Sequence, residues 1–130
     1  MSSTSIFTKI INREIPAEIE YEDEQFIAIH DINPAAPIHI LIIPKEPLQT
    51  LEAVDIDDAE FHSQILKIAR QVAQKLGISE NYKLLMNVGK KVQAVHHIHL
   101  HLLGGWPEEK SVEELDAESE KFAKETAPQA

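Results

Sequence analysis

The chain has no cysteine among its 130 residues. Disulfide bonds and thiol catalysis are therefore excluded, and no cysteine is available to complete the usual kind of structural zinc site. Proteins of a reducing compartment often lack cysteine, so this absence favours a cytoplasmic location.

Long hydrophobic runs and a surplus of positive charge are missing as well. No apolar run approaches the ~18 residues that a membrane-spanning helix needs, so no membrane span is expected. The first residues lack the positively charged start and the apolar stretch of a secretory signal. The chain has 12 Lys and Arg against 22 Asp and Glu, a net charge of −10. Nucleic-acid binders need a basic surface, so this charge argues against that class of protein.

The distribution of apolar residues predicts a single α+β domain. Segments with helical and strand periodicity are separated by turn-forming residues. Strands followed by one long helix and then by further strands favour a mostly antiparallel, five-stranded sheet. The predicted elements are a short helix from Ser5 to about Asn12, strands over residues 18–22, 25–32, 38–44, 82–88 and 96–103, and a long helix from about Asp57 to Leu76 that Asp55 or Asp57 caps and Gly77 ends.

The character of the chain changes after Pro107. Residues 108–130 hold eight Asp or Glu and three Lys or Arg, a net charge of −5 and half of the total. We expect a domain over residues 1–107 and an acidic tail over residues 108–130, partly helical or disordered. The apolar residues that allow a weak helix in the tail are Val112, Leu115, Phe122 and Ala123.

A run of histidines, which are residues able to act in catalysis or to bind metals, precedes a pair of glycines. Four of the seven histidines lie within residues 96–101. Three of them alternate with apolar residues, the period of a half-buried strand, so His97, His99 and His101 are expected to share one face. A sheet does not need three imidazoles in a row to fold, so this face is interpreted as a site. The residues expected on the core-facing side are His96, Ile98, Leu100 and Leu102.

The spacing of these histidines favours phosphate chemistry over metal binding. Side chains two residues apart on one strand face lie about 7 Å apart, and those four residues apart ~13–14 Å. An imidazole nitrogen lies about 2 Å from a bound zinc, so His97 and His101 cannot both reach one ion from a straight strand. A phosphate group is wide enough for His99 and His101 to contact different atoms of it. The middle histidine can then attack while its neighbours orient it and donate hydrogen bonds. No metal and no other cofactor is therefore predicted.

The segment His97-Ile98-His99-Leu100-His101-Leu102-Leu103 resembles the His-φ-His-φ-His-φ-φ signature of the histidine triad (HIT) superfamily. Separate blocks upstream, in the same order, resemble its Hint branch, the purine nucleoside phosphoramidases. The resemblance covers about residues 5–107. The upstream blocks are Ser5-Ile6-Phe7, Ile10-Ile11, Glu14-Ile15-Pro16-Ala17, His30-Asp31-Ile32-Asn33-Pro34 and His39-Ile40-Leu41-Ile42-Ile43-Pro44-Lys45.

The resemblance implies both a fold and a function. The fold is HIT-like, with one long and one short helix, and its five-stranded sheet continues across a homodimer. The function is a hydrolase of purine nucleoside phosphoramidates, substrates derived from AMP or GMP, that releases the nucleoside monophosphate. Acyl-nucleotidylates are a further substrate class that such an enzyme would accept.

The resemblance also implies a role for each of four histidines. His99 attacks the α-phosphorus and becomes nucleotidylated, and water then hydrolyses this intermediate. His101 donates a hydrogen bond to a phosphate oxygen as charge develops. His97 orients its neighbours, and His39, which lies in an otherwise apolar strand, supports His97.

A nucleoside pocket follows from the same resemblance. Asp31 is expected to accept hydrogen bonds from the ribose hydroxyls, Asn87 to contact the phosphate and His30 to lie beside the pocket. Gln93 and Ala94 are expected to contact the nucleotide as well. Ala94 replaces the hydroxyl residue that assists the leaving amine in Hint proteins, so nucleotide binding and nucleotidylation are expected with slower turnover. The residues expected to enclose the base are Phe7, Ile10, Ile15, Ile29, Ile32 and Leu41.

Three other functions stay open on the sequence. A dinucleoside polyphosphate hydrolase belongs to the same superfamily. A nucleotide-binding regulatory or scaffold protein with weak catalysis is suggested by Ala94, because alanine cannot donate a proton. A metal-binding module is the third, and zinc in protein purified without added metal would support it.

Overall fold

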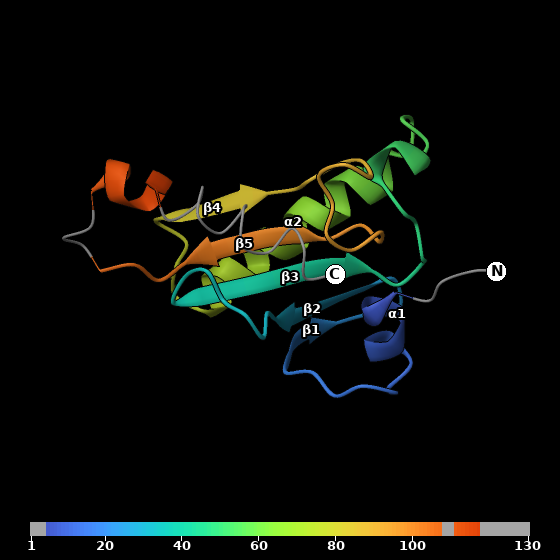
Figure 1. Ribbon diagram of the computed structural model, residues 1–130, viewed down its shortest axis with the longest axis horizontal. Coiled ribbons are helices and arrows are strands. Elements are labelled where there is room, and N and C mark those ends of the chain that lie inside the picture. The colour runs from blue at the N-terminus through green and yellow to red at the C-terminus, as the bar shows by residue number, and fades with distance from the viewer. Residues whose placement is uncertain (1–4, 108–110, 118–130) are drawn as a thin grey trace.

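The computed structural model describes residues 5–107 and 111–117 of the chain. Figure 1 shows its strands side by side in one sheet, with α2 behind the sheet. The sheet has five strands and is antiparallel, which confirms the predicted mostly antiparallel, five-stranded sheet. Its strands run in the order β1-β2-β3-β5-β4. The elements are α1 (Ile6–Ile11), β1 (Ile19–Glu22), β2 (Phe26–His30), β3 (Ile38–Pro44), the 3₁₀ turn η1 (Leu51–Ala53), α2 (Ala59–Lys75), β4 (Tyr82–Leu85) and β5 (Leu100–Gly104).

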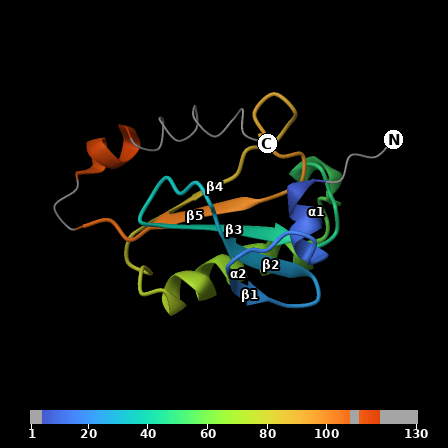
Figure 2. The same cartoon turned by 60° about the horizontal axis from the view of Figure 1, so that its bottom comes forward.

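An apolar cluster lies on each face of the sheet, because successive strand residues point to opposite sides. Figure 2 shows α2 along the lower face and α1 beside the ends where β3 finishes and β5 begins. Helix α2 buries Ile65, Ile68 and Val72, which have helical spacing in the sequence, against that lower face. On the opposite face, α1 contributes Phe7 and Ile10. The strand residues of this second cluster are Ile27, Ile29, Leu41 and Ile43.

The helix ends follow local hydrogen-bonding rules. Ser5 caps α1 as predicted, since its hydroxyl oxygen accepts from the Thr8 N–H at 3.1 Å. The cap of α2 is Asp58, which accepts from the Phe61 N–H, so the prediction of Asp55 or Asp57 was wrong. Gly77 ends α2 as predicted, because its φ of +74° is a conformation that glycine adopts without strain.

The last strand begins later than predicted, at Leu100 and not at residue 96. The N–H of Ile98 bonds to the carbonyl of Leu48, in the loop after β3, so the chain before Leu100 leaves the sheet. His96 is exposed in a bend, and its predicted core-facing position was wrong. Strand β4 ends at Leu85, which pairs with His101, so residues 86–88 form no ladder.

A short helix over residues 112–117 follows the domain. Ser111 and Glu114 form a capping box, each side chain accepting from the other's backbone N–H. The Lys83 ammonium of β4 donates to the carbonyl of Leu115 at 3.0 Å and to the carboxylate of Asp116 at 3.1 Å. The other apolar tail residues of the prediction, Phe122 and Ala123, lie outside the described residues. No helix in the described part of the chain is long and apolar enough to cross a membrane.

Candidate active site

Four histidines lie buried on the face of the sheet opposite α2. His101 is part of β5, His99 and His97 precede it, and His39 is on the neighbouring strand β3. Their exposed fractions are 2% for His39, 1% for His97, 7% for His99 and 5% for His101. Buried imidazoles need hydrogen-bond partners, and those partners decide which ring nitrogen carries the proton.

His99 presents the chemistry of a nucleophile. Its Nδ1 lies 2.7 Å from the backbone carbonyl oxygen of His97, which only accepts, so Nδ1 carries the proton and donates. In the neutral ring, Nε2 then keeps its lone pair. Burial lowers the pKa of His99, which keeps the ring neutral at physiological pH. The nucleophilic nitrogen is therefore set by a backbone group.

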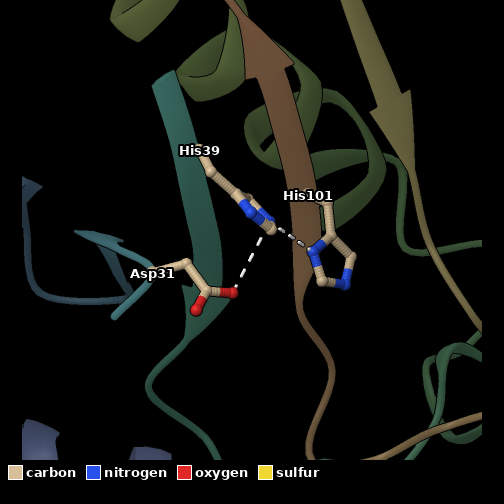
Figure 3. A group of neighbouring side chains, drawn as sticks. All are labelled: Asp31, His39 and His101. Atoms are coloured by element: carbon tan, nitrogen blue, oxygen red, sulfur yellow. Dashed lines mark hydrogen bonds and ion pairs between the residues drawn. The ribbon is translucent and has the colours of Figure 1, made fainter. Parts of the chain in front are cut away.

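His101 is held in the opposite tautomer by a chain of hydrogen bonds that runs through His39. The backbone N–H of Ala35 donates to His39 Nδ1 at 3.1 Å, so His39 carries its proton on Nε2. That Nε2–H donates to His101 Nδ1 at 2.9 Å, as Figure 3 shows. His101 then carries its own proton on Nε2. Burial, and to a lesser degree the nearby rings of His99 and His39, lowers the pKa of His101 to about 3.

The position of His39 corrects one expectation from the sequence. His39 was expected to support His97, but its ring bonds to His101, on the adjacent strand. The register explains this contact. Leu41 pairs with His101 and His39 with Leu103, so the side chains of His39, Leu41 and His101 lie on one face of the sheet. Asp31, at the end of β2, places its Oδ2 3.5 Å from His39 Nε2 (Figure 3).

The ring of His97 points toward helix α1 and away from its two neighbours in the triad. Its Nε2 donates to the carbonyl of Pro44 at 2.8 Å, and its Nδ1 lies 2.9 Å from the hydroxyl of Ser5. Burial lowers the pKa of His97, so the ring is neutral. The group of His97 that contacts His99 is thus its backbone carbonyl, while its ring anchors the surrounding chain.

A cavity of about 160 Å³ opens beside His99 and His101. Most of its wall is apolar, and none of the described residues that line it is Lys or Arg. An anionic group in this cavity would therefore meet neutral donors and no cationic side chain. Of the predicted residues, those that line the cavity are Phe7, Ile10, Ile15, Ile29, His30, Asp31, Ile32, Leu41, Asn87, Ala94, His99 and His101.

Gln93 does not line this cavity, contrary to its predicted contact with the nucleotide. Its amide nitrogen donates to the carbonyls of Gln49 at 2.8 Å and Val95 at 3.1 Å, and its amide oxygen accepts from the Gly89 N–H at 2.7 Å. These bonds hold the loop that carries Ala94 against the domain. The cavity therefore gives no support to the predicted contact of Gln93 with the nucleotide, because a sequence position does not indicate the direction of a loop side chain.

Some cavity-lining residues were not predicted from the sequence. Each of them except Ala17 adjoins a predicted residue in the chain, and Ala17 lies two positions after Ile15, so closeness in sequence is the signal that would have identified them. They are Ile6, Pro16, Ala17, Asn33, Val92 and Val95.

Among the residues that the structure describes, Asp31, His39 and His101 form a group whose side chains could hold a metal ion. One ligand atom from each lies within 4.8 Å of the others. The two nitrogens nearest each other are already 2.9 Å apart in a hydrogen bond whose proton a metal would have to replace. The hydrogen-bonded pair explains these contacts without an ion, so the donor set fits a proton better than a metal.

Comparison with known proteins agrees with this geometry. The HIT domain model matches residues 12–108. An uncharacterized HIT-like protein from Synechocystis is 48% identical over 108 residues, which are 82% of this chain and 95% of that protein. The structure of a HIT family hydrolase from Legionella pneumophila is similar with a TM-score of 0.75 and 46% identity, covering 80% of this chain and 95% of that one. A histidine triad nucleotide-binding protein from Candida albicans has a TM-score of 0.69 and 32% identity, over 98% of this chain and 100% of that one. The chain therefore belongs to the HIT domain family.

Proposed function

We propose that this protein is a nucleotide hydrolase of the Hint type, which releases a purine nucleoside monophosphate from a phosphoramidate. The observation that carries the proposal is the tautomer of His99. Its Nδ1–H is bound to the carbonyl of His97, so its unprotonated Nε2 belongs to a ring that lines the cavity. The solved relatives include a HIT family hydrolase and a histidine triad nucleotide-binding protein, which supports both halves of the proposal.

The first step transfers the nucleotide to His99. Its Nε2 attacks the α-phosphorus, the new phosphorus–nitrogen bond forms, and the bond to the leaving amine breaks. The amine departs with the electron pair of that bond and takes a proton from solvent water. The modified ring is formally cationic, and the carbonyl of His97 at Nδ1 stabilises that charge. His101 donates from Nε2 to a phosphate oxygen, where negative charge accumulates.

The second step restores the enzyme. Water attacks the phosphorus, the bond to His99 Nε2 breaks, and the ring returns to its neutral form. The water's proton passes to solvent, and the nucleoside monophosphate leaves. In both steps the apolar wall, including Phe7, Ile10 and Leu41, encloses the base. Asp31 accepts from the ribose hydroxyls, and Asn87 contacts the phosphate.

The test is release of AMP from adenosine 5′-phosphoramidate by wild type and by His99→Ala. We expect wild type to release AMP and to show a nucleotidylated histidine by intact mass. H99A should be at least about a thousandfold slower, because the nucleophile is absent. His96→Ala is the matched control, since His96 is an exposed neighbour of the triad outside the cavity. AMP release by H99A at the wild-type rate would disprove the proposed nucleophile.

A regulatory protein with weak catalysis is the second candidate, and one observation favours it. Ala94 lines the cavity but has no proton to give to a leaving amine. Restoring a hydroxyl with Ala94→Ser should raise turnover of amine-leaving substrates about a hundredfold, the lower end of the usual contribution of general acid catalysis. AMP binding without turnover in both proteins would favour the regulatory function. Faster cleavage of a dinucleoside polyphosphate than of the phosphoramidate would favour the other enzyme class.

We also propose that the protein is a homodimer, as the sequence resemblance implied, and that it is cytoplasmic, as the absence of cysteine favours. The described sheet has two outer strands, β1 and β4, and either has an edge that a second copy can extend. Light scattering should give twice the mass of one chain. A single-chain mass at micromolar concentration would contradict the dimer.

A further inference from the structure

The hydroxyl of Ser5 joins the short helix α1 to the triad. Its oxygen accepts from the Thr8 N–H at 3.1 Å, which is the cap of the helix. The same oxygen lies 2.9 Å from His97 Nδ1. His97 carries its ring proton on Nε2, where it donates to Pro44, so Nδ1 accepts and the Ser5 hydroxyl donates to it. One side chain therefore satisfies both a helix end and a buried ring.

His97 transmits this constraint to His99. Its ring is held at both nitrogens. Ser5 lies 2.9 Å from Nδ1, with the Thr8 hydroxyl farther away at 3.5 Å, and the Pro44 carbonyl accepts from Nε2. A ring held at both ends restricts the backbone to which it is attached, and the carbonyl of that backbone accepts from His99 Nδ1 at 2.7 Å. Phe7, two residues after Ser5, packs its edge against both rings, with centroids 5.8 Å from His97 and 5.0 Å from His99.

Helix α1 is also a wall of the proposed nucleoside pocket. Ile6, Phe7 and Ile10, the residues that follow the Ser5 cap, line the cavity. A base bound against this wall would therefore contact the same helix whose N-cap residue, Ser5, bonds to His97. Helix α1 would then set both the position of the substrate and, through His97, the orientation of the His99 ring.

We propose that Ser5 is a positioning residue, which fixes His97 and through it the orientation and tautomer of His99 relative to a nucleotide bound against α1. This inference rests on the proposed function, since it takes His99 as the nucleophile. Because Ser5 itself does not contact the reacting atoms, its loss should slow nucleotidylation more than it weakens substrate binding.

Three substitutions at Ser5 separate the helix cap from the bond to His97. Ser5→Ala removes both. Ser5→Thr keeps a hydroxyl that caps the helix and donates to the ring. Ser5→Gly keeps the helix end nearly as stable, because glycine is well tolerated at an N-cap, but it removes the bond to His97. Asp58→Ala is the matched control, since it removes the cap of α2, which packs on the opposite face of the sheet.

The full-length variants are compared by single-turnover nucleotidylation with adenosine 5′-phosphoramidate, by KM and by the ¹⁵N spectrum of the imidazoles. We expect S5A to be about tenfold to a hundredfold slower with little change in KM. S5T should recover most of the rate. S5G should stay as slow as S5A, because it also lacks the hydroxyl that donates to His97 Nδ1. D58A should melt at a lower temperature and nucleotidylate at the wild-type rate.

Wild-type rates in S5A or S5G would overturn the positioning role. So would equal slowing in D58A, because general destabilisation would then explain the loss. If the wild type forms no nucleotidylated histidine, the proposed function fails and the spectra decide the role of Ser5 alone. Unchanged ¹⁵N shifts of the His97 and His99 rings in S5A would then overturn it, and shifted resonances of both rings would support it.

Discussion

At the scale of single residues, four chemically identical side chains receive different chemistry from their partners. A backbone carbonyl fixes the proton of His99 on Nδ1, which leaves a lone pair on Nε2. A backbone N–H, from Ala35, fixes the proton of His39 on Nε2 and so the proton of His101 on its own Nε2. Backbone groups cannot change tautomer, so they are dependable references for rings that can.

The role of His39 gives a prediction at this scale. Replacing it with phenylalanine, His39→Phe, keeps an aromatic ring in the buried site but removes the donor to His101 Nδ1. His101 can then carry its proton on either nitrogen, so nucleotidylation should fall about tenfold to a hundredfold. His39→Gln, which retains an N–H donor and an acceptor, should lose less. Single-turnover rates measure both, and a wild-type rate in H39F would contradict the assigned tautomer chain.

At the scale of elements, the site depends on how the central strands are supported. Strands β3 and β5 carry His39 and His101, and their other faces pack against α2. Burial on that face thus holds the two histidines in register. Helix α1 does the same from the opposite face, through Phe7 and the Ser5 cap.

Two positions on α2 test this support. Ile68 is 1% exposed in the cluster beneath β3 and β5, whereas Leu66 is 50% exposed. Ile68→Ala should lower the free energy of unfolding by about 2–5 kcal/mol, since it leaves a cavity in the core. Leu66→Ala should change it by less than about 0.5 kcal/mol. Urea unfolding measures both, and similar values for the two variants would show that α2 packs differently.

At the scale of the whole molecule, burial of four imidazoles couples folding to pH. Burial is the first cause of the lowered pKa at His39, His97, His99 and His101. In the unfolded chain these rings are exposed to water, and they take up a proton near the ordinary histidine pKa of 6.5. The folded protein resists protonation, so acid favours the unfolded state.

The pH dependence of stability follows with a definite sign. For His101 the unfolded ring takes a proton near pH 6.5 and the folded ring near pH 3, so its contribution to stability is complete above pH 6.5 and is lost as the pH falls through this window. Each such proton changes the free energy of unfolding by about 1.4 kcal/mol per pH unit. His101→Gln should therefore show a shallower fall between pH 6.5 and 4. Urea unfolding across this range measures the slopes, and equal slopes would contradict a neutral, buried His101.

Regular elements could be predicted because their signals are local. The apolar run over residues 38–44 identified β3 with its bounds, and the helical spacing of Ile65, Ile68 and Val72 is a local signal for the buried face of α2. The histidine signature likewise predicted the HIT family. Prediction failed where the chain leaves a regular element, as at His96, because the Leu48 carbonyl that draws Ile98 out of the sheet belongs to a distant loop.

The sequence by itself determined the period of each element, the face on which each histidine of the triad lies and the family to which the chain belongs. These follow from backbone geometry and from residues close together in the chain. Only the tertiary structure decided which partner each histidine has. His39 meets His101 across 62 positions, and Ser5 meets His97 across 92. Such contacts exist only after the strands have paired and α1 has packed against the sheet. They place the proton of His101 and hold the ring of His97.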